Sequence, residues 1–174
     1  SVDVWANPEI FGIDDEGEMI DMAGVPPDHF SDYGQLGGMP VFRWDVLKAN
    51  DYSWWIERLR KNIELFDVAR LDLFRAFSDY WQVPANEMTA VNGEWMQGPR
   101  EDFFRAVKKR LGELPFIAED LGDIDEAVHL LRNECNMPGM KVLQFAFGEK
   151  MAGGNYIPNN YSRDFVVYTG THDN

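Results

Sequence analysis

Apolar residues repeat every three or four positions in three segments of the chain. The first covers residues 51–66, the second covers residues 100–112, and the third begins after Asp123. This spacing places the apolar side chains on one face of a helix and predicts three amphipathic helices. Asp51 and Asp123 are in position to cap the first and third helices at their N-termini, and Gly112 suits the C-terminus of the second.

Short apolar runs lie between and after these helices and predict four strands, at residues 67–72, 115–119, 140–146 and 165–169. Strands that alternate with helices in this way are typical of α/β proteins with a parallel sheet. Four such strands fit either a small open sheet or half of a closed (β/α)8 barrel. The hydrophobic pattern alone does not choose between the two.

The first 43 residues show neither pattern. They contain four of the nine prolines and six of the 15 glycines, which predicts a long ordered loop or a set of turns. A loop of this length inside a compact domain is uncommon, and it is usually functional where it occurs. We therefore expect a functional loop region at residues 1–43 and α/β units at residues 44–174.

Charge and composition exclude several classes of function. The 174 residues include 30 acidic and 16 basic ones, a formal charge of -14 at pH 7, and such a field repels nucleic acids and anionic membranes. No apolar run reaches the roughly 18 residues that span a bilayer, and the N-terminus lacks the pattern of a signal peptide. The single Cys135 shares no metal-ligand spacing with the three histidines. We expect a cytoplasmic protein with no metal or cofactor, and with no nucleic acid or membrane partner.

Three carboxylates, Asp72, Glu119 and Asp173, lie at or just after the ends of predicted strands. In a (β/α)8 barrel the carboxyl ends of the strands form the active face, so such acids can meet in one pocket. Retaining glycoside cleavage needs one carboxylate as nucleophile and a second carboxyl group as proton donor. Arg70 lies two residues before Asp72, on the same side of the strand, where it can keep Asp72 ionised. For Glu119 we expect a raised pKa, caused by the nearby charge of Asp72.

Other interpretations of these residues stay open. An aspartate after a strand often caps the next helix, and Asp120 beside Glu119 has that option. Aromatic rings can stack on sugars, and the contact candidates are those in predicted loops: Trp5, Tyr33, Trp81 and Trp95. The aromatic residues on the predicted helices are expected to belong to the core: Trp54, Trp55, Phe103 and Phe104. Residue patterns alone therefore indicate an α/β domain that is compatible with a carbohydrate enzyme, without identifying its reaction.

Seven longer segments run in order through the chain: DVWANPEIF (3–11), AGVPPDHFSDYGQL (23–36), ARLDLFRAFSDYWQVPA (69–85), AVNGEWMQGP (90–99), FIAEDLG (116–122), MPGMKVLQFAF (137–147) and VVYTGTHDN (166–174). Together they resemble the amylomaltases, the 4-α-glucanotransferases of glycoside hydrolase family 77. The resemblance implies a (β/α)8 (TIM) barrel of the α-amylase clan. It also implies a retaining enzyme that transfers segments of 1,4-α-glucans, such as maltodextrins, to a new 4-position.

By position, the resemblance also implies roles for individual residues. Asp72, in RLDLFRA, matches the nucleophile, Glu119, in AEDLG, matches the general acid/base, and Asp173, in THDN, matches the acid that stabilises the transition state. Arg70 and His172 match residues that contact the sugar beside the cleaved bond. Contacts on the acceptor side are implied for two residues of the proline-rich loop, Asp28 and Gln35.

Three positions depart from the family, and one of them is Ala76, which replaces a glycine. Gly37 stands where the family usually has tryptophan, and Leu73, after the matched nucleophile, stands where it generally has histidine. These departures leave two alternatives to a transferase: a catalytically impaired relative that binds α-glucan, and an α-glucan hydrolase. Family members are far longer, so the resemblance implies that residues 1–174 are a single internal fragment of the catalytic barrel. It places the loop region 1–43 at the substrate cleft and barrel strands four to seven in the α/β units at 44–174. Open sheet edges and apolar surface favour self-association of such a fragment, which we expect to be inactive alone.

Overall fold

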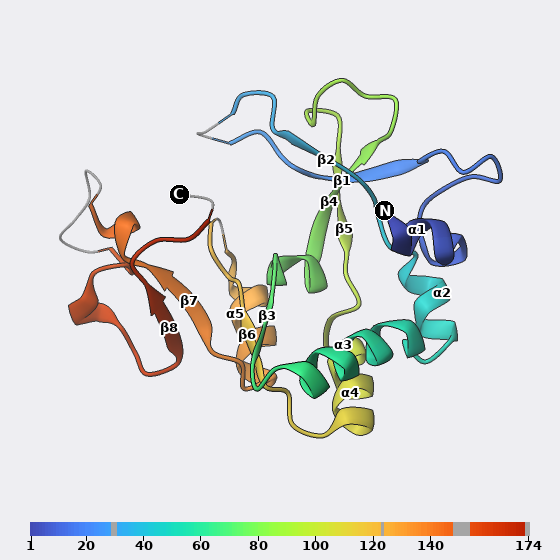
Figure 1. Cartoon of the computed structure of the whole chain (residues 1–174). Helices are drawn as coiled ribbons and strands as arrows, with labels where there is room; N and C mark the ends of the chain where they lie inside the picture. Colours follow the sequence, from blue (N-terminus) through green and yellow to red (C-terminus); the bar gives the residue numbers. More distant parts are fainter. Residues whose placement is uncertain (29–30, 123, 148–153, 173–174) are drawn as a thin grey trace. The chain divides into compact units, whose positions relative to one another are not determined.

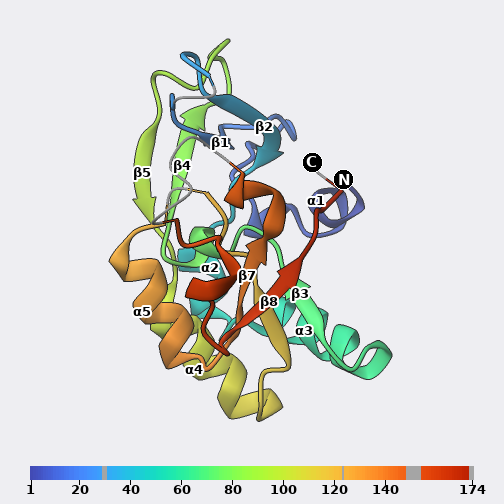
Figure 2. The same ribbon diagram turned by 90° about the vertical axis from the view of Figure 1, so that its left-hand side faces the viewer.

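The structure, a computed structural model, describes residues 1–28, 31–122, 124–147 and 154–172. It is a mixed α/β structure that divides into two compact units (Figures 1 and 2). Unit 1 comprises residues 1–58 and 76–110, and unit 2 comprises residues 59–75 and 111–174. The chain crosses between the units three times: within the helix Ser53–Leu65, within the 3-10 helix Phe74–Phe77 and just before the last residue of the helix Arg100–Leu111.

The helices are α1 (Val2–Ala6), α2 (Trp44–Ala49), α3 (Ser53–Leu65), α4 (Arg100–Leu111) and α5 (Glu126–Glu134). The strands are β1 (Asp21–Val25), β2 (Gln35–Pro40), β3 (Ala69–Leu71), β4 (Asp79–Pro84), β5 (Glu94–Gln97), β6 (Phe116–Ala118), β7 (Gly139–Val142) and β8 (Phe165–Tyr168). Short 3-10 helices cover Pro8–Ile10, Phe74–Phe77, Leu143–Ala146 and Pro158–Asn160. Within the described ranges, no helix is long and apolar enough to cross a membrane.

The three predicted helices are present as α3, α4 and α5, with two corrections at their caps. Asp51 lies in the turn before α3 with φ +51°, so it is not the N-cap. Helix α5 is capped by Asp125, whose side chain accepts a hydrogen bond from the Val128 N–H at 3.1 Å. The cap expected at Asp123 lies outside the described residues. Helix α4 ends directly before Gly112, as predicted.

Unit 1 contains a four-stranded antiparallel sheet in the order β2-β1-β4-β5. The prediction that residues 1–43 form a loop or turns is therefore wrong in part, because β1 and β2 lie within this range. Strand β2, QLGGMP, is exposed along most of its length, so it lacks the alternation of apolar and polar residues that identifies a half-buried strand. The hydrophobic pattern also did not predict strands β4 and β5.

Gly37 lies in β2, against the backbone of β1. A Cβ at this position would approach the carbonyl oxygen of Ala23 to 2.6 Å, so the strands can pair here because residue 37 has no side chain. The register between the two strands also shifts between Met22 and Gly24.

Aromatic rings form much of the core of unit 1. Phe77 stacks on the fully buried Phe103, with ring centroids 5.1 Å apart, and Trp55 contacts both rings edge-on. The interpretation of the helical aromatic residues as core is confirmed for Phe103 and Phe104, which are buried. Trp81 and Trp95 do not lie in loops: they face each other across β4 and β5 with rings 5.4 Å apart.

Unit 2 contains a strand in each of the four segments that the hydrophobic pattern predicts. The prediction for residues 140–146 is wrong in part, because β7 ends at Val142 and Leu143–Ala146 form a 3-10 helix. Strand β3 pairs in parallel with β6, and β7 pairs in parallel with β8. The Ala118 N–H donates a hydrogen bond to the Pro138 carbonyl at 2.9 Å, which connects the end of β6 with the residue before β7. Helix α5 joins β6 to β7. The predicted α/β character is thus confirmed in unit 2.

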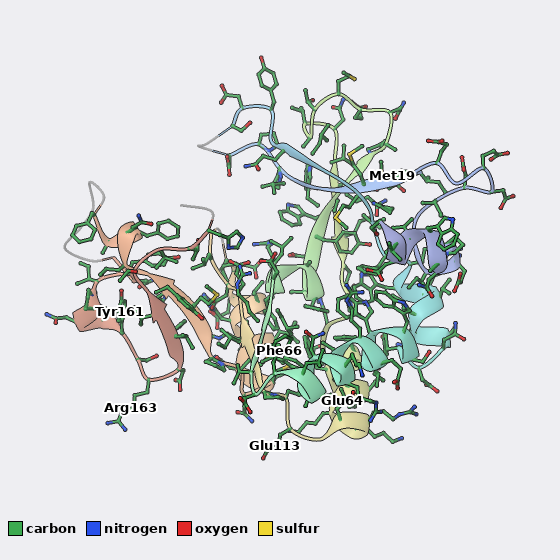
Figure 3. All side chains as sticks on the ribbon, viewed as in Figure 1. Met19, Glu64, Phe66, Glu113, Tyr161 and Arg163 are labelled. Carbon is green, nitrogen blue, oxygen red and sulfur yellow. The ribbon has the colours of Figure 1, made fainter. Side chains whose placement is uncertain are left out.

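Unit 2 exposes three apolar side chains at the end of α3 and directly after it. Leu65, Phe66 and Val68 have exposed fractions of 64%, 59% and 53%, and Figure 3 shows Phe66 at the end of this helix. Neighbouring exposed apolar residues of this kind favour contacts with other molecules. Self-association of the chain stays a prediction.

Candidate active site

Arg70 and Asp72 form an ion pair at the carboxyl end of β3. The Arg70 Nη2 lies 2.7 Å from the Asp72 Oδ1, and the Asp72 side chain is 75% exposed. The guanidinium is also fixed at its Nε, which lies 3.3 Å from the Sδ of Met140 in β7. Because alternate strand residues point to the same side, this pair follows directly from the spacing in the sequence. The ion pair leaves the carboxylate of Asp72 accessible beside the fixed guanidinium of Arg70.

Glu119 directly follows β6 and is only 9% exposed. Each of its carboxylate oxygens accepts a backbone hydrogen bond: Oε2 from the Leu73 N–H at 2.9 Å and Oε1 from the Leu121 N–H at 2.8 Å. The main chain of both neighbouring segments therefore fixes the orientation of this carboxyl group.

Burial raises the pKa of Glu119 above its ordinary value, since it disfavours the charged form. The two backbone hydrogen bonds and the charge of Arg70 act in the opposite direction, and the charge of Asp72 raises the pKa further. The predicted direction is confirmed, but its cause is corrected: burial contributes most and Asp72 contributes least. Glu119, whose pKa is raised, is the carboxyl group for which the role of proton donor is predicted.

Leu73 has a left-handed backbone conformation, with φ +45°. This conformation is unfavourable for a leucine because its Cβ crowds the following carbonyl. The main chain around it is nevertheless tied down, because the Phe74 N–H donates to the Glu119 carbonyl at 3.0 Å and the Glu119 N–H donates to the Leu71 carbonyl at 2.9 Å. The turn after β3 thereby directs the Leu73 N–H at the carboxylate of Glu119.

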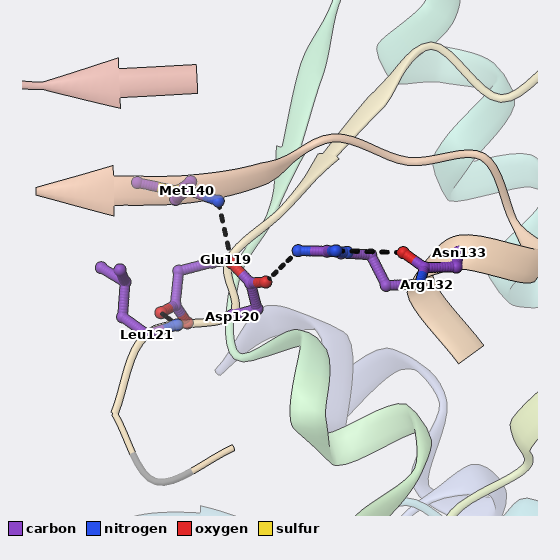
Figure 4. A network of polar contacts seen from close by, with 6 residues as sticks. All are labelled: Glu119, Asp120, Leu121, Arg132, Asn133 and Met140. Carbon is purple, nitrogen blue, oxygen red and sulfur yellow. Dashed lines mark hydrogen bonds and ion pairs between the residues drawn. The ribbon is translucent and has the colours of Figure 1, made fainter. Parts of the chain in front are cut away.

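Asp120 points away from Glu119 and is buried (Figure 4). Its Oδ2 lies 2.6 Å from the Nη1 of Arg132 in α5, and its Oδ1 accepts the Met140 N–H at 2.8 Å. The alternative that Asp120 caps the next helix is thus wrong, since Asp125 caps α5.

The other predicted site residues lie elsewhere in the chain. His172 is an exposed residue that follows β8 in unit 2, and Asp173 lies outside the described residues. Asp28 and Gln35 belong to unit 1, where the Oδ1 of Asp28 accepts the Ser31 N–H at 2.9 Å and Gln35 begins β2. The structure thus brings together Arg70, Asp72 and Glu119, and the predicted sugar contacts of the remaining residues are not tested.

Unit 1 has a pocket of about 350 Å³ of its own. Its walls include the rings of Trp44 and Tyr80 and the carboxyl group of Asp21. Burial and the charges of Asp21 and Asp45 raise the pKa of the Tyr80 hydroxyl. The predicted site residues of unit 1, Asp28 and Gln35, are not among the described residues that line this pocket.

The sequence profile of the 4-alpha-glucanotransferases, glycoside hydrolase family 77, matches residues 1–174. The 4-alpha-glucanotransferase of Synechocystis is 55% identical over 177 aligned residues, and that of Thermus thermophilus is 50% identical over 176. The chain belongs to the 4-alpha-glucanotransferase family. The resemblance deduced from its motifs is confirmed.

A solved 4-alpha-glucanotransferase has nearly the same fold. The amylomaltase from Streptococcus agalactiae, solved in complex with acarbose, superposes with a TM-score of 0.95 and is 42% identical over all of this chain. The chain spans 35% of that structure and 35% of the Synechocystis and Thermus relatives. The match therefore covers about a third of a typical family member.

Sequence reasoning missed the groups that hold Glu119. The Leu73 and Leu121 N–H donors leave no trace in a sequence, because every residue except proline has such a donor. The partnership of Asp120 with Arg132 was also missed, although a charged residue on the apolar side of a helix is a signal that could have found it. Arg132 lies next to the buried Leu131 in α5 and is itself buried.

Proposed function

We propose that the complete protein containing this chain is a 4-α-glucanotransferase. It transfers a segment of a 1,4-α-glucan to a new 4-position of an acceptor sugar by a retaining double displacement. In this proposal Asp72 is the nucleophile, Glu119 is the general acid/base and Asp173 stabilises the transition state. Substrate contacts are assigned to Arg70, His172, Asp28 and Gln35. The names of the relatives support the activity.

The observation that carries the proposal is the contrast between Asp72 and Glu119 on two paired parallel strands. Asp72 is exposed and ion-paired with Arg70, as suits an ionised nucleophile. Glu119 is buried with a raised pKa, as suits a proton donor. Two carboxyl groups in such different environments are the arrangement that a retaining glycosidase mechanism needs.

The two half-reactions use these groups in turn. First, a carboxylate oxygen of Asp72 bonds to C1 of the donor sugar while the bond from C1 to the glycosidic oxygen breaks, and Glu119 gives its proton to that oxygen. Glu119 is then a carboxylate, and the N–H groups of Leu73 and Leu121 stabilise this form. Next, Glu119 takes the proton from the acceptor's 4-hydroxyl as that oxygen bonds to C1 and displaces Asp72.

The fold proposal follows from the same strands. We infer that β3, β6, β7 and β8 are strands four to seven of a (β/α)8 barrel, because consecutive parallel strands with the acids at their carboxyl ends fit this architecture. In this arrangement β4 and β5 of the antiparallel sheet are inserted between β3 and β6. The other two strands of that sheet, β1 and β2, come from the segment that precedes α2.

The substrate class is proposed from the ligand of a relative. The Streptococcus agalactiae amylomaltase was solved with acarbose, and we infer that the present protein takes maltodextrins and other α-1,4-glucans in the corresponding place. The acidic net charge of -14 is compatible with a neutral sugar polymer, which the field of the protein does not repel.

Incubation of the complete protein with maltotriose tests this function. A ladder of shorter and longer dextrins in the product mixture supports transfer. Glucose and maltose without longer products indicate the hydrolase, and unchanged maltotriose together with measurable binding indicates the catalytically impaired relative. Either of the last two results contradicts the proposal.

A further inference from the structure

Asp120 and Arg132 form a buried ion pair beside the proposed site. The two side chains are 2% and 7% exposed, and the Asp120 Oδ2 lies 2.6 Å from the Arg132 Nη1. The second carboxylate oxygen of Asp120 accepts the Met140 N–H at 2.8 Å. Both oxygens of Asp120 are therefore bound, as both oxygens of Glu119 are, but on the opposite side of the chain (Figure 4).

Arg132 extends this contact to two further elements. Its Nη2 donates to the Asn133 Oδ1 at 3.0 Å, within α5. Its guanidinium also lies over the ring of Phe165 in β8, with 4.6 Å between the Cζ and the ring centroid. One ion pair thus connects the end of β6 with α5, β7 and β8.

Gly139, the first residue of β7, leaves the space that the ion pair occupies. A Cβ at this position would collide with the Arg132 Nη1 and with both carboxylate oxygens of Asp120. The requirement for glycine is therefore one of space, and an alanine at this position would push the two charged groups out of place.

Stability alone does not explain such a pair. Removing two charges from water costs free energy that their attraction only partly returns, and apolar side chains of similar size are often as stabilising. A doubly bound carboxylate instead fixes the direction of the main chain that carries it. The main chain at Asp120 includes the peptide bond that links it to Glu119.

We infer that Asp120 and Arg132, packed on Gly139, are positioning residues that hold Glu119 against the N–H groups of Leu73 and Leu121. The consequence for turnover rests on the proposed function. A displacement of about 1 Å at a reacting group can cost roughly 10²-fold in rate. Loss of the pair should therefore lower kcat while substrate binding remains.

Three variants of the complete protein test the inference: Asp120→Asn, the double change Asp120→Leu with Arg132→Met, and Gly139→Ala. Asp120→Asn places an amide nitrogen against one of the two donors, the Arg132 guanidinium or the Met140 N–H. The double change replaces the ion pair by apolar groups. Gly139→Ala retains both charges but fills the space that they occupy. Asp125→Asn is the matched control, because it removes one charge from the same segment and asparagine still caps α5.

The first readout does not depend on glucan turnover. In protein labelled with 15N-leucine, the amide signals of Leu73 and Leu121 should titrate together with Glu119 in the parent and in the control. In the three variants this shared titration should be lost. The second readout is maltotriose turnover, for which we expect kcat to fall about 10²-fold with KM within about threefold, and no change in the control.

A folded double variant that retains both the shared titration and the parent's kcat overturns the inference. Lost titration with an unchanged kcat overturns its catalytic part. If Asp120→Asn or the double variant does not fold, Gly139→Ala decides by the same two readouts. If the parent does not convert maltotriose but its shared titration disappears in the variants, the positioning stands and the proposed function fails.

Discussion

The ends of β3 and β6 hold their carboxyl groups in opposite ways. After β3, Asp72 is open to solvent and its contact is with a side chain, the guanidinium of Arg70. After β6, Glu119 is buried and its contacts are with main-chain N–H groups. A side-chain partner leaves Asp72 accessible to a sugar, whereas burial and the backbone fix Glu119 in one orientation. The two acids thus differ in their surroundings rather than in their chemistry, and the proposed division of roles between nucleophile and proton donor rests on this difference.

The largest effect is expected at the β3 end. Asp72→Asn in the complete protein should lower glucan transfer by several orders of magnitude, because a carboxamide cannot carry the glycosyl group covalently. Maltotriose disproportionation measures the loss, and circular dichroism checks the fold. Asp67 is an exposed residue just before β3, so Asp67→Asn is the control and should retain activity. Transfer within about tenfold of the parent would contradict the nucleophile assignment.

At the β6 end the expected loss depends on the leaving group. Glu119→Gln cannot donate a proton, so transfer from maltotriose should fall by about 10²–10⁴-fold. A glucosyl fluoride donor needs little protonation of its leaving group, and the first half-reaction with it should be nearly retained. Single-turnover release of fluoride separates this half-reaction from the second. Equal losses with both donors would remove the acid/base role from Glu119.

The two ends also differ in how stability depends on pH. Because its pKa in the folded protein is raised above the ordinary 4.5, Glu119 contributes stability that is full below this value and is lost as pH rises through the raised pKa. The free energy of unfolding of Glu119→Gln relative to the parent should therefore increase with pH across this window. Urea denaturation at a series of pH values measures it.

Glu64 supplies the control of opposite sign for this measurement. A hydrogen bond and the charge of Lys61 lower the pKa of this exposed glutamate, so its contribution is present above its ordinary pKa and is lost as pH falls. Glu64→Gln should therefore become relatively less stable as pH rises. The same trend in both variants would contradict the burial assigned to Glu119.

A smaller effect is expected from the turn that connects the two ends. Leu73 has φ +45°, and asparagine tolerates this region better than leucine. Leu73→Asn should therefore stabilise the folded protein by about 0.5 kcal/mol, a part of the roughly 1–2 kcal/mol that the left-handed conformation costs. The same exchange at the exposed Leu130 in α5 should cost a few tenths of a kcal/mol instead. Equal changes in the midpoint of urea denaturation at both positions would show that Leu73 is not strained.

Periodicity predicts unit 2 better than unit 1. The strands of unit 2 are short apolar runs between amphipathic helices, so burial leaves a clear pattern in the sequence, and the positions of Asp72 and Glu119 follow from the strand ends. Strands β1 and β2 owe their pairing to the close approach at Gly37, and in a sequence such a glycine also predicts a turn. Antiparallel strands with an exposed face need few apolar residues, so they resemble loops.

The environment of Glu119 could not be predicted for a different reason. Its burial and its two N–H donors depend on the turn at Leu73 and on contacts between segments that are 46 residues apart. Asp120 and Arg132 are 12 residues apart, outside any helical or strand spacing that pairs side chains. Motif resemblance identified the acids, and only the folded chain shows what orients them.

In the proposed mechanism Asp72 carries the glycosyl group while Glu119 moves the proton. The most direct measurement is to incubate the Glu119→Gln variant of the complete protein with α-maltotriosyl fluoride, digest it and locate the added mass by peptide mass spectrometry. With the second half-reaction slowed, we expect the maltotriosyl mass on the peptide that contains Asp72, and none when Asp72→Asn is added. A label on any other carboxylate, or a label that persists in the double variant, would contradict the account.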